Sequence, residues 1–176
     1  MRMVKVTLIA ILLVVVGLAV VAAQARRASP HESTHATIDG ALVTITYGRP
    51  FARGRAIFGS LIPYGRVWCP GADEATTLDS PRDLRVGDLT VPAGPHTIWI
   101  LPTADTWTLI VSKEPSGFHT NYNASANLGK VDLTKRAIET PVEQLTFAVV
   151  NNPAGRGGLV TMTWELTEVS VPFTVQ

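Results

Sequence analysis

After residue 40 the chain consists mostly of short runs in which apolar and polar residues alternate with a period of two, the pattern of half-buried β-strands. In ALVTITYG, residues 41–48, apolar side chains recur at Val43, Ile45 and Tyr47, and β-branched residues predominate, as a pleated surface favours. In DLRVGDLTV, residues 83–91, a Gly-Asp pair separates two such runs. This spacing predicts a tight hairpin.

A longer hairpin is predicted from GPHTIWILP, residues 94–102, and TWTLIVSK, residues 106–113, which are separated by Thr-Ala-Asp. Thr97, Trp99 and Leu101 are two residues apart and share one face of the first run. Trp107 shares a face of the second run with apolar residues at the same spacing. Both tryptophans are therefore predicted to face a core.

A third hairpin is predicted from residues 141–152 and 159–173, joined by PAGRGG. In its second strand, every other residue from Val160 to Leu166 shares one face, which places Trp164 in the core. The alternation slips near Glu168 and Val169, and a slip of one residue predicts a bulge or a strand that changes sheets.

No segment after residue 25 shows a long helical period, although SANLGKVDLTKRA, residues 125–137, could contain a helical turn. The chain has 14 glycines and 12 prolines, which suits many short strands joined by turns. These features predict an all-β fold, an antiparallel two-sheet β-sandwich, jelly-roll-like or similar. A sandwich is favoured over a closed barrel because the strands are unevenly spaced.

The N-terminal residues 1–25 have a basic start, an apolar run over residues 6–23 and small residues at the end, the order of an export signal. The run is also almost long enough to cross a bilayer, so a removed signal peptide and a retained signal anchor both fit. Either places the rest of the chain in the periplasm or cell envelope. We expect a polar tether over 26–35 and a single β-sandwich domain over 36–176.

The charge balance argues against nucleic acid as a partner. Without Arg2 and Lys5 of the signal, 13 basic residues face 14 acidic ones, and a nucleic-acid site would need a clustered basic excess. The only cysteine, Cys69, cannot form an internal disulfide. Its neighbours Trp68 and Pro70 predict a packed, unreactive thiol.

Candidate chemistry is concentrated in residues 47–77, which contain four arginines and several aromatic rings. The arginines could converge on a carboxylate or phosphate, or they could form a structural network with nearby carboxylates. Tyr64 and Trp68 lie outside clean alternation and could form a flat apolar wall for a ligand. The candidate ligand-binding residues are Arg49, Arg53, Arg55, Tyr64, Arg66, Trp68 and Glu74.

Catalytic signatures are weak. Asp73 and Glu74 are adjacent, so in a strand they would point to opposite faces and could not act as a pair. The sequence has no Gly-x-Ser-x-Gly elbow and no phosphate-cradling glycine loop. An alternative is a metal-assisted hydrolase in which His96, His119 and Asp73 or Glu74 bind the ion.

Several motifs together resemble a bacterial family, domain of unknown function 2911. They are YGRP, RGRAIFG, LIPYGRVW, GADEATT, VPAG and TWTLIVSK, in this order between residues 47 and 113. The resemblance covers residues 29–173 and implies an exported β-rich domain, with no catalytic residues to carry over. The chain departs from the family pattern at Cys69, Asp73 and His96, where members often have a basic residue, Asn and Tyr.

The sequence therefore predicts an exported, non-catalytic β-sandwich that uses no cofactor. Its expected partner is a small anionic or carbohydrate-like ligand, or an envelope protein, bound through residues 47–77. A metal-assisted hydrolase and a purely structural envelope protein remain the alternatives.

Overall fold

The computed structural model describes residues 28–176. The predicted signal or anchor over residues 1–25 lies outside them. Within 28–176, no helix is long and apolar enough to cross a membrane. The strands are β1 (His31–Ile38), β2 (Ala41–Gly48), β3 (Thr77–Ser80), β4 (Leu84–Val86), β5 (Leu89–Val91), β6 (Gly94–Pro102), β7 (Trp107–Ser112), β8 (Asn127–Asn151) and β9 (Gly158–Val175).

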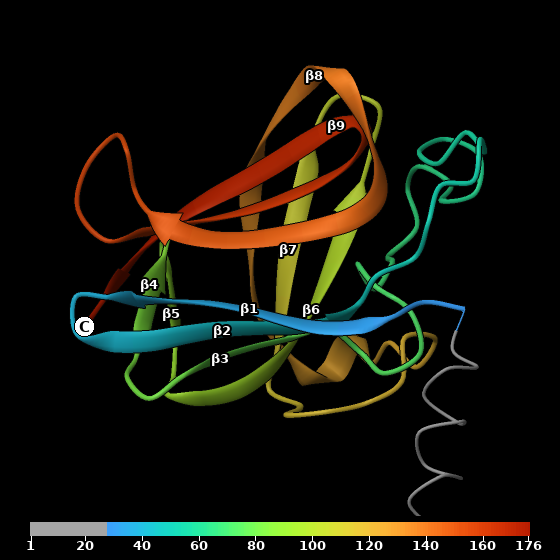
Figure 1. Ribbon diagram of the computed structural model, residues 1–176. Helices are drawn as coiled ribbons and strands as arrows, with labels where there is room; N and C mark the ends of the chain where they lie inside the picture. The colour runs from blue at the N-terminus through green and yellow to red at the C-terminus, as the bar shows by residue number, and fades with distance from the viewer. Residues whose placement is uncertain (1–27) are drawn as a thin grey trace, which may run out of the picture.

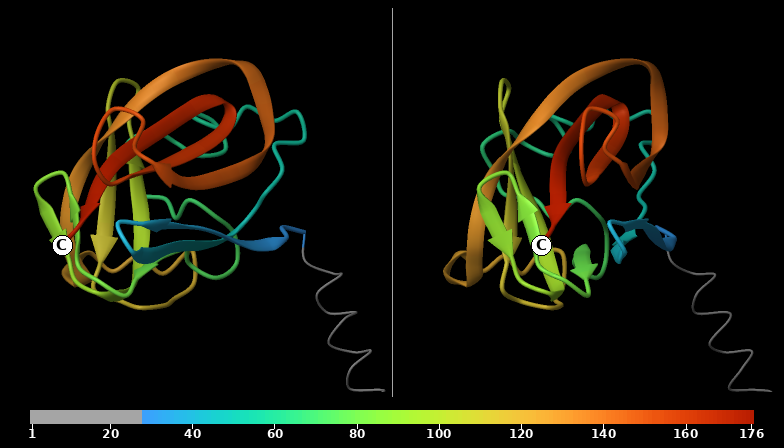
Figure 2. Two further views of the ribbon diagram at one scale, coloured as in Figure 1. Left: turned by 60° about the vertical axis from the view of Figure 1, so that its left-hand side comes forward. Right: turned by 90° about the vertical axis from the view of Figure 1, so that its left-hand side faces the viewer.

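The strands form one nine-stranded antiparallel sheet in the order β1-β2-β3-β6-β7-β8-β9-β4-β5. The predicted all-β antiparallel class is therefore confirmed. The sequence predicted two sheets, but both layers belong to one continuous sheet. The long strands β8 and β9 bend, so that one part of the sheet lies over the other (Figure 1). Figure 2 shows the resulting layers from two further sides.

The main core lies between these layers. Its buried residues come from all nine strands, and they include Ile45 of β2, Phe147 of β8 and Trp164 of β9. A second, smaller core lies on the other face of β6 and β7, where Trp99 packs with Cys69. The alternation in β6 therefore has apolar residues on both sides, because loop residues 67–75 cover its outer face.

The three predicted hairpins are present. Val86 pairs with Leu89, Pro102 with Trp107, and the β8–β9 ladder ends at its turn. Trp99, Trp107 and Trp164 are all buried, as predicted.

The expected shared face from Val160 to Leu166 is wrong at its end, because Leu166 is 50% exposed. The face changes at Glu165, whose positive φ of 53° reverses the direction of the next side chain. The β8–β9 register shifts opposite this residue. The irregularity that the sequence suggested near Glu168 thus occurs three residues earlier.

Two local expectations also change. The helical turn considered for 125–137 is a 3-10 turn at Ala124–Ala126 that overlaps only the start of this region, and β8 begins directly after it, because pairing with β7 supplies the backbone hydrogen bonds. β1 begins at His31, inside the expected polar tether, since its ladder to β2 satisfies the backbone whatever the polarity of its side chains.

Candidate functional site

The first residues of the segment 47–77, Tyr47 and Arg49, connect neighbouring strands to β8. The Tyr47 hydroxyl is buried and accepts a hydrogen bond from the Phe147 backbone N–H at 3.0 Å, and burial raises the pKa of the Tyr47 phenol. The Arg49 guanidinium donates to the Leu145 carbonyl at 3.1 Å and to Thr146 Oγ1 at 2.9 Å, and it pairs with Glu32 of β1. Because its donors are used within the protein, Arg49 ties β1 and β2 to β8.

Beyond Arg49, residues 51–62 form a loop that is fixed to the bend of β8 and β9. The Glu143 carbonyl accepts from the Ala52 N–H at 2.7 Å, and the Glu143 carboxylate accepts from the Arg53 N–H at 2.8 Å. The Glu165 carboxylate accepts from the Ile57 N–H at 3.1 Å. These bonds hold one wall of a surface cleft.

The cleft has a volume of about 360 Å³. It is lined by Ala28, Ser29, Pro50, Phe51, Arg53, Arg55, Leu61, Ile62, Trp68, Gly71, His119 and Trp164. Among the described residues that line it, Arg53, Arg55 and His119 are the titratable ones, and none is a carboxylate. The titratable side chains that line the cleft are therefore basic.

The two arginines differ in their freedom. Arg55 donates through Nε to the Ala52 carbonyl at 2.9 Å and through Nη2 to the Phe51 carbonyl at 2.6 Å, which stiffens the loop. Arg53 is exposed, and its guanidinium carbon lies 5.9 Å from the centre of the Phe51 ring. Within residues 28–176, no carboxylate lies within ion-pair distance of the Arg53 guanidinium.

The aromatic side of the cleft is a packed group of rings. Trp68 and Trp164 stack with centroids 6.1 Å apart and an interplanar angle of 21°. Phe58 meets both rings edge-on, at 6.0 and 6.1 Å. Trp68 is also held by paired backbone hydrogen bonds to Ile100, at 2.8 Å each. Trp68 therefore lies in a packed group of rings that lines one side of the cleft.

His119 has a defined orientation at the cleft. Its Nδ1 lies 2.7 Å from the Asp73 carbonyl oxygen, and its backbone N–H donates to the same oxygen at 2.9 Å. A carbonyl only accepts, so Nδ1 carries the hydrogen in this contact. Nε2 is then the ring nitrogen available for other chemistry.

Four predicted ligand residues do not line the cleft, and Arg49, whose donors are used by β8 and Glu32, is one of them. Tyr64 is 42% exposed and packs its ring over Gly59, where an added Cβ would lie 2.8 Å from it. Arg66 is exposed, and Glu74 pairs with His31 at 2.7 Å.

The alternative metal set of His96, His119 and Asp73 is not assembled. His96 is buried, and its ring nitrogens lie 2.8 Å from the Ser112 carbonyl and 3.0 Å from the Pro92 carbonyl. Neither nitrogen is available to an ion without breaking one of these contacts.

The expectation that Asp73 and Glu74 point to opposite faces is wrong. Asp73 has a φ of 64° and so leaves the extended conformation that the expectation assumed. The two carboxylates and the His31 ring each bring an oxygen or nitrogen within 4.8 Å of the other two.

Cys69 is buried, and its sulfur accepts from the Thr76 N–H at 3.3 Å. Burial raises the pKa of the thiol to about 11, so the thiolate is scarce at neutral pH. This agrees with the predicted unreactive role.

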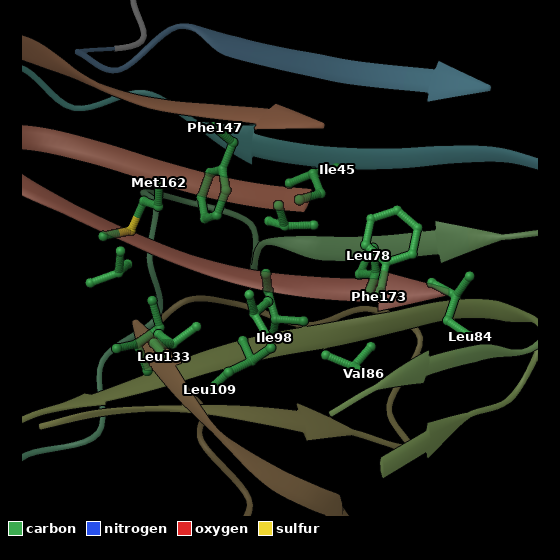
Figure 3. Close-up of a pocket in the computed structure, with 14 residues that line it drawn as sticks. Ile45, Leu78, Leu84, Val86, Ile98, Leu109, Leu133, Phe147, Met162 and Phe173 are labelled. Atoms are coloured by element: carbon green, nitrogen blue, oxygen red, sulfur yellow. The ribbon is translucent and has the colours of Figure 1, made fainter. Parts of the chain in front are cut away.

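The main core also contains an internal cavity of about 30 Å³ (Figure 3). Its lining is wholly apolar, and residues such as Leu109, Met162 and Phe173 point into it from several strands. Ligand pockets are typically ten or more times larger. We therefore assign the cavity to imperfect packing and the site to the surface cleft.

Several cleft residues were not predicted as site residues, among them Phe51, Leu61, Ile62, Gly71 and Trp164. Trp164 was assigned to the core from its alternation, and it is indeed buried while also lining the cleft. No local signal distinguishes such a residue, because the cleft is formed by Trp164 together with residues of the 51–62 loop, which lies far from it in the sequence.

These features define an all-β domain with a basic, aromatic-walled surface cleft. A family model described as a protein of unknown function (DUF2911) matches residues 29–173. The chain therefore belongs to this family, as its motifs indicated. Neither the curated proteins nor the solved structures contain a match to it.

Proposed function

We propose that this protein is an exported binding module that holds a small anion with a flat apolar part in the cleft between the 51–62 loop and His119. The observation that carries the proposal is a cleft of about 360 Å³ with two arginines and no carboxylate in its described lining. The size falls within the usual range of small-molecule sites.

Arg53 is the main anion-binding group in this proposal. Its guanidinium is exposed, has no carboxylate partner among the described residues, and can bind a carboxylate or phosphate through two parallel hydrogen bonds. Arg55 adds positive charge while it holds the loop carbonyls. His119 also lines the cleft, with its ring held by the Asp73 carbonyl.

The tryptophans account for the apolar part of the ligand. Trp68 is partly exposed and is held from behind by Trp164, so it can cover a flat face without rearrangement. The neutral carbohydrate alternative is less favoured, because it would leave the charge of Arg53 without a partner in the complex.

Binding can be tested with the purified full-length chain and four probes, glucuronate, benzoate, inorganic phosphate and neutral glucose. A ligand of the native state raises the melting temperature, and calorimetry then gives its affinity. We expect binding of at least one anion, and no binding of glucose. Loss of charge-assisted hydrogen bonds worth about 1.5–3 kcal/mol should weaken binding at least tenfold in Arg53→Gln.

Arg66→Gln is the matched control, since Arg66 is exposed on the same segment but does not line the cleft. It should bind the anion as the wild type does. The proposal is wrong if no anion changes the melting temperature, or if Arg66→Gln loses as much affinity as Arg53→Gln.

A further inference from the structure

Three potential metal ligands that are far apart in the sequence meet next to the cleft. His31 lies at the start of β1, and Asp73 and Glu74 lie in the loop before β3. One ligand atom from each lies within 4.8 Å of the other two. His31 Nε2 is already 2.7 Å from a Glu74 carboxylate oxygen.

The fold brings these residues together through a close backbone contact. His31 is opposite Gly48 in the β1–β2 ladder. Gly48 in turn packs directly against the backbone of Ala72, because a Cβ at Gly48 would lie only 2.2 Å from the Ala72 carbonyl oxygen. The residues after Ala72 are thereby placed beside the start of β1.

The loop that carries the carboxylates is anchored from the other side. The Asp73 carbonyl accepts two hydrogen bonds from His119, and the Ala75 N–H donates to the Gly117 carbonyl at 2.9 Å. Glu74 forms an isolated bridge with Phe118. The backbone of the candidate ligands is therefore held in place, which favours binding because little order must be gained.

The geometry points to a divalent transition-metal site formed by His31, Asp73 and Glu74. One imidazole and two carboxylates suit ions such as Zn²⁺. Ligands at about 2.0–2.2 Å from a tetrahedral ion lie roughly 3.4 Å from one another, so the three side chains need only small rotations. The His31 and Glu74 side chains are 24% and 56% exposed, which gives an ion access.

Three protein ligands leave one coordination position of a tetrahedral ion open, as in catalytic zinc sites. His119 lines the cleft and also contacts Asp73, so the site adjoins the cleft. It uses neither Arg53 nor Arg55, and its test is therefore independent of the proposed anion binding.

The test is a calorimetric titration of the purified, chelator-treated full-length chain with Zn²⁺ alone, supported by the visible spectrum of the Co²⁺ form. We expect one ion per chain. Glu74→Gln and Asp73→Asn should each weaken Zn²⁺ at least tenfold, since loss of a ligand costs no less than loss of an outer-shell partner. Circular dichroism checks that each variant is folded. Glu74→Gln should disturb the fold least, because the Glu74 side chain is exposed.

His35→Gln and Asp79→Asn are the controls, because both residues are exposed on nearby strands and neither belongs to the cluster. They should bind Zn²⁺ with wild-type affinity. Absence of Zn²⁺ binding by the wild type would overturn the site. Equal affinity in the wild type and Glu74→Gln would likewise overturn the site.

Discussion

The contact between Gly48 and Ala72 provides the sharpest test of how this fold positions its candidate sites. In Gly48→Ala, the new Cβ would lie 2.2 Å from the Ala72 carbonyl oxygen and 3.0 Å from its carbon. The distance to the oxygen is more than 1 Å shorter than the ~3.5 Å separation at which nonbonded atoms attract. The obstructing atoms belong to the backbone, so no side-chain rotation relieves the clash.

The expected cost follows from two opposing effects. Overpacking of this kind costs about 1–3 kcal/mol, and a backbone clash belongs at the upper end. Replacing glycine by alanine also restricts the unfolded chain, which returns about 0.4–1 kcal/mol. The net loss is about 2 kcal/mol, which for about 150 residues lowers the melting temperature by roughly 4–8 °C.

Thermal and urea unfolding of the two proteins measure this difference. Gly117→Ala is the matched control, because its new Cβ would meet only the Ala75 Cβ, at 3.9 Å. Its melting temperature should equal or exceed that of the wild type. If Gly48→Ala unfolds no earlier than Gly117→Ala, the close contact is not a constraint, and the argument for how Asp73 reaches His31 fails with it.

Two further predictions concern the hydrogen bonds of Arg49 and the buried thiol of Cys69. Arg49→Met should lose about 1.5–3 kcal/mol of stability in urea unfolding, because it removes charge-assisted hydrogen bonds to β8, while Arg66→Met should change stability by less than about 0.5 kcal/mol. Burial raises the pKa of Cys69 to about 11, so the unfolded thiol ionises before the folded one. Stability should therefore be complete below about pH 8.5 and fall by up to ~3 kcal/mol towards pH 11. Cys69→Ala should remove that part of the fall, and a wild-type pH profile in this variant would contradict the assignment.

The strands were predictable because their signal is local. Val43, Ile45 and Tyr47 alternate with polar residues, and all three are buried. Period-two alternation identifies a strand wherever one of its faces is covered. The same rule explains the failure at Leu166, since the positive φ at Glu165 reverses the face without any change in residue type.

The candidate site was predicted less completely. Arg53, Arg55 and Trp68 were identified as candidates from the density of charge and aromatic rings, and the structure places them in one cleft. Arg49 belongs to the same cluster in sequence, yet its donors are used by β8, which lies almost a hundred residues further along the chain. Sequence proximity could not separate a free arginine from a paired one.

The sequence by itself determined the all-β class, the three hairpins and the burial of Trp99, Trp107 and Trp164, because these depend on alternation within a strand and on short turns. Tertiary structure decided which functional side chains meet. His31 lies beside Asp73 and Glu74 because Gly48 lets the Ala72 backbone approach, and the cleft is lined jointly by the 51–62 loop and Trp164 of β9. Such contacts join segments that no local pattern relates, so only the folded chain reveals them.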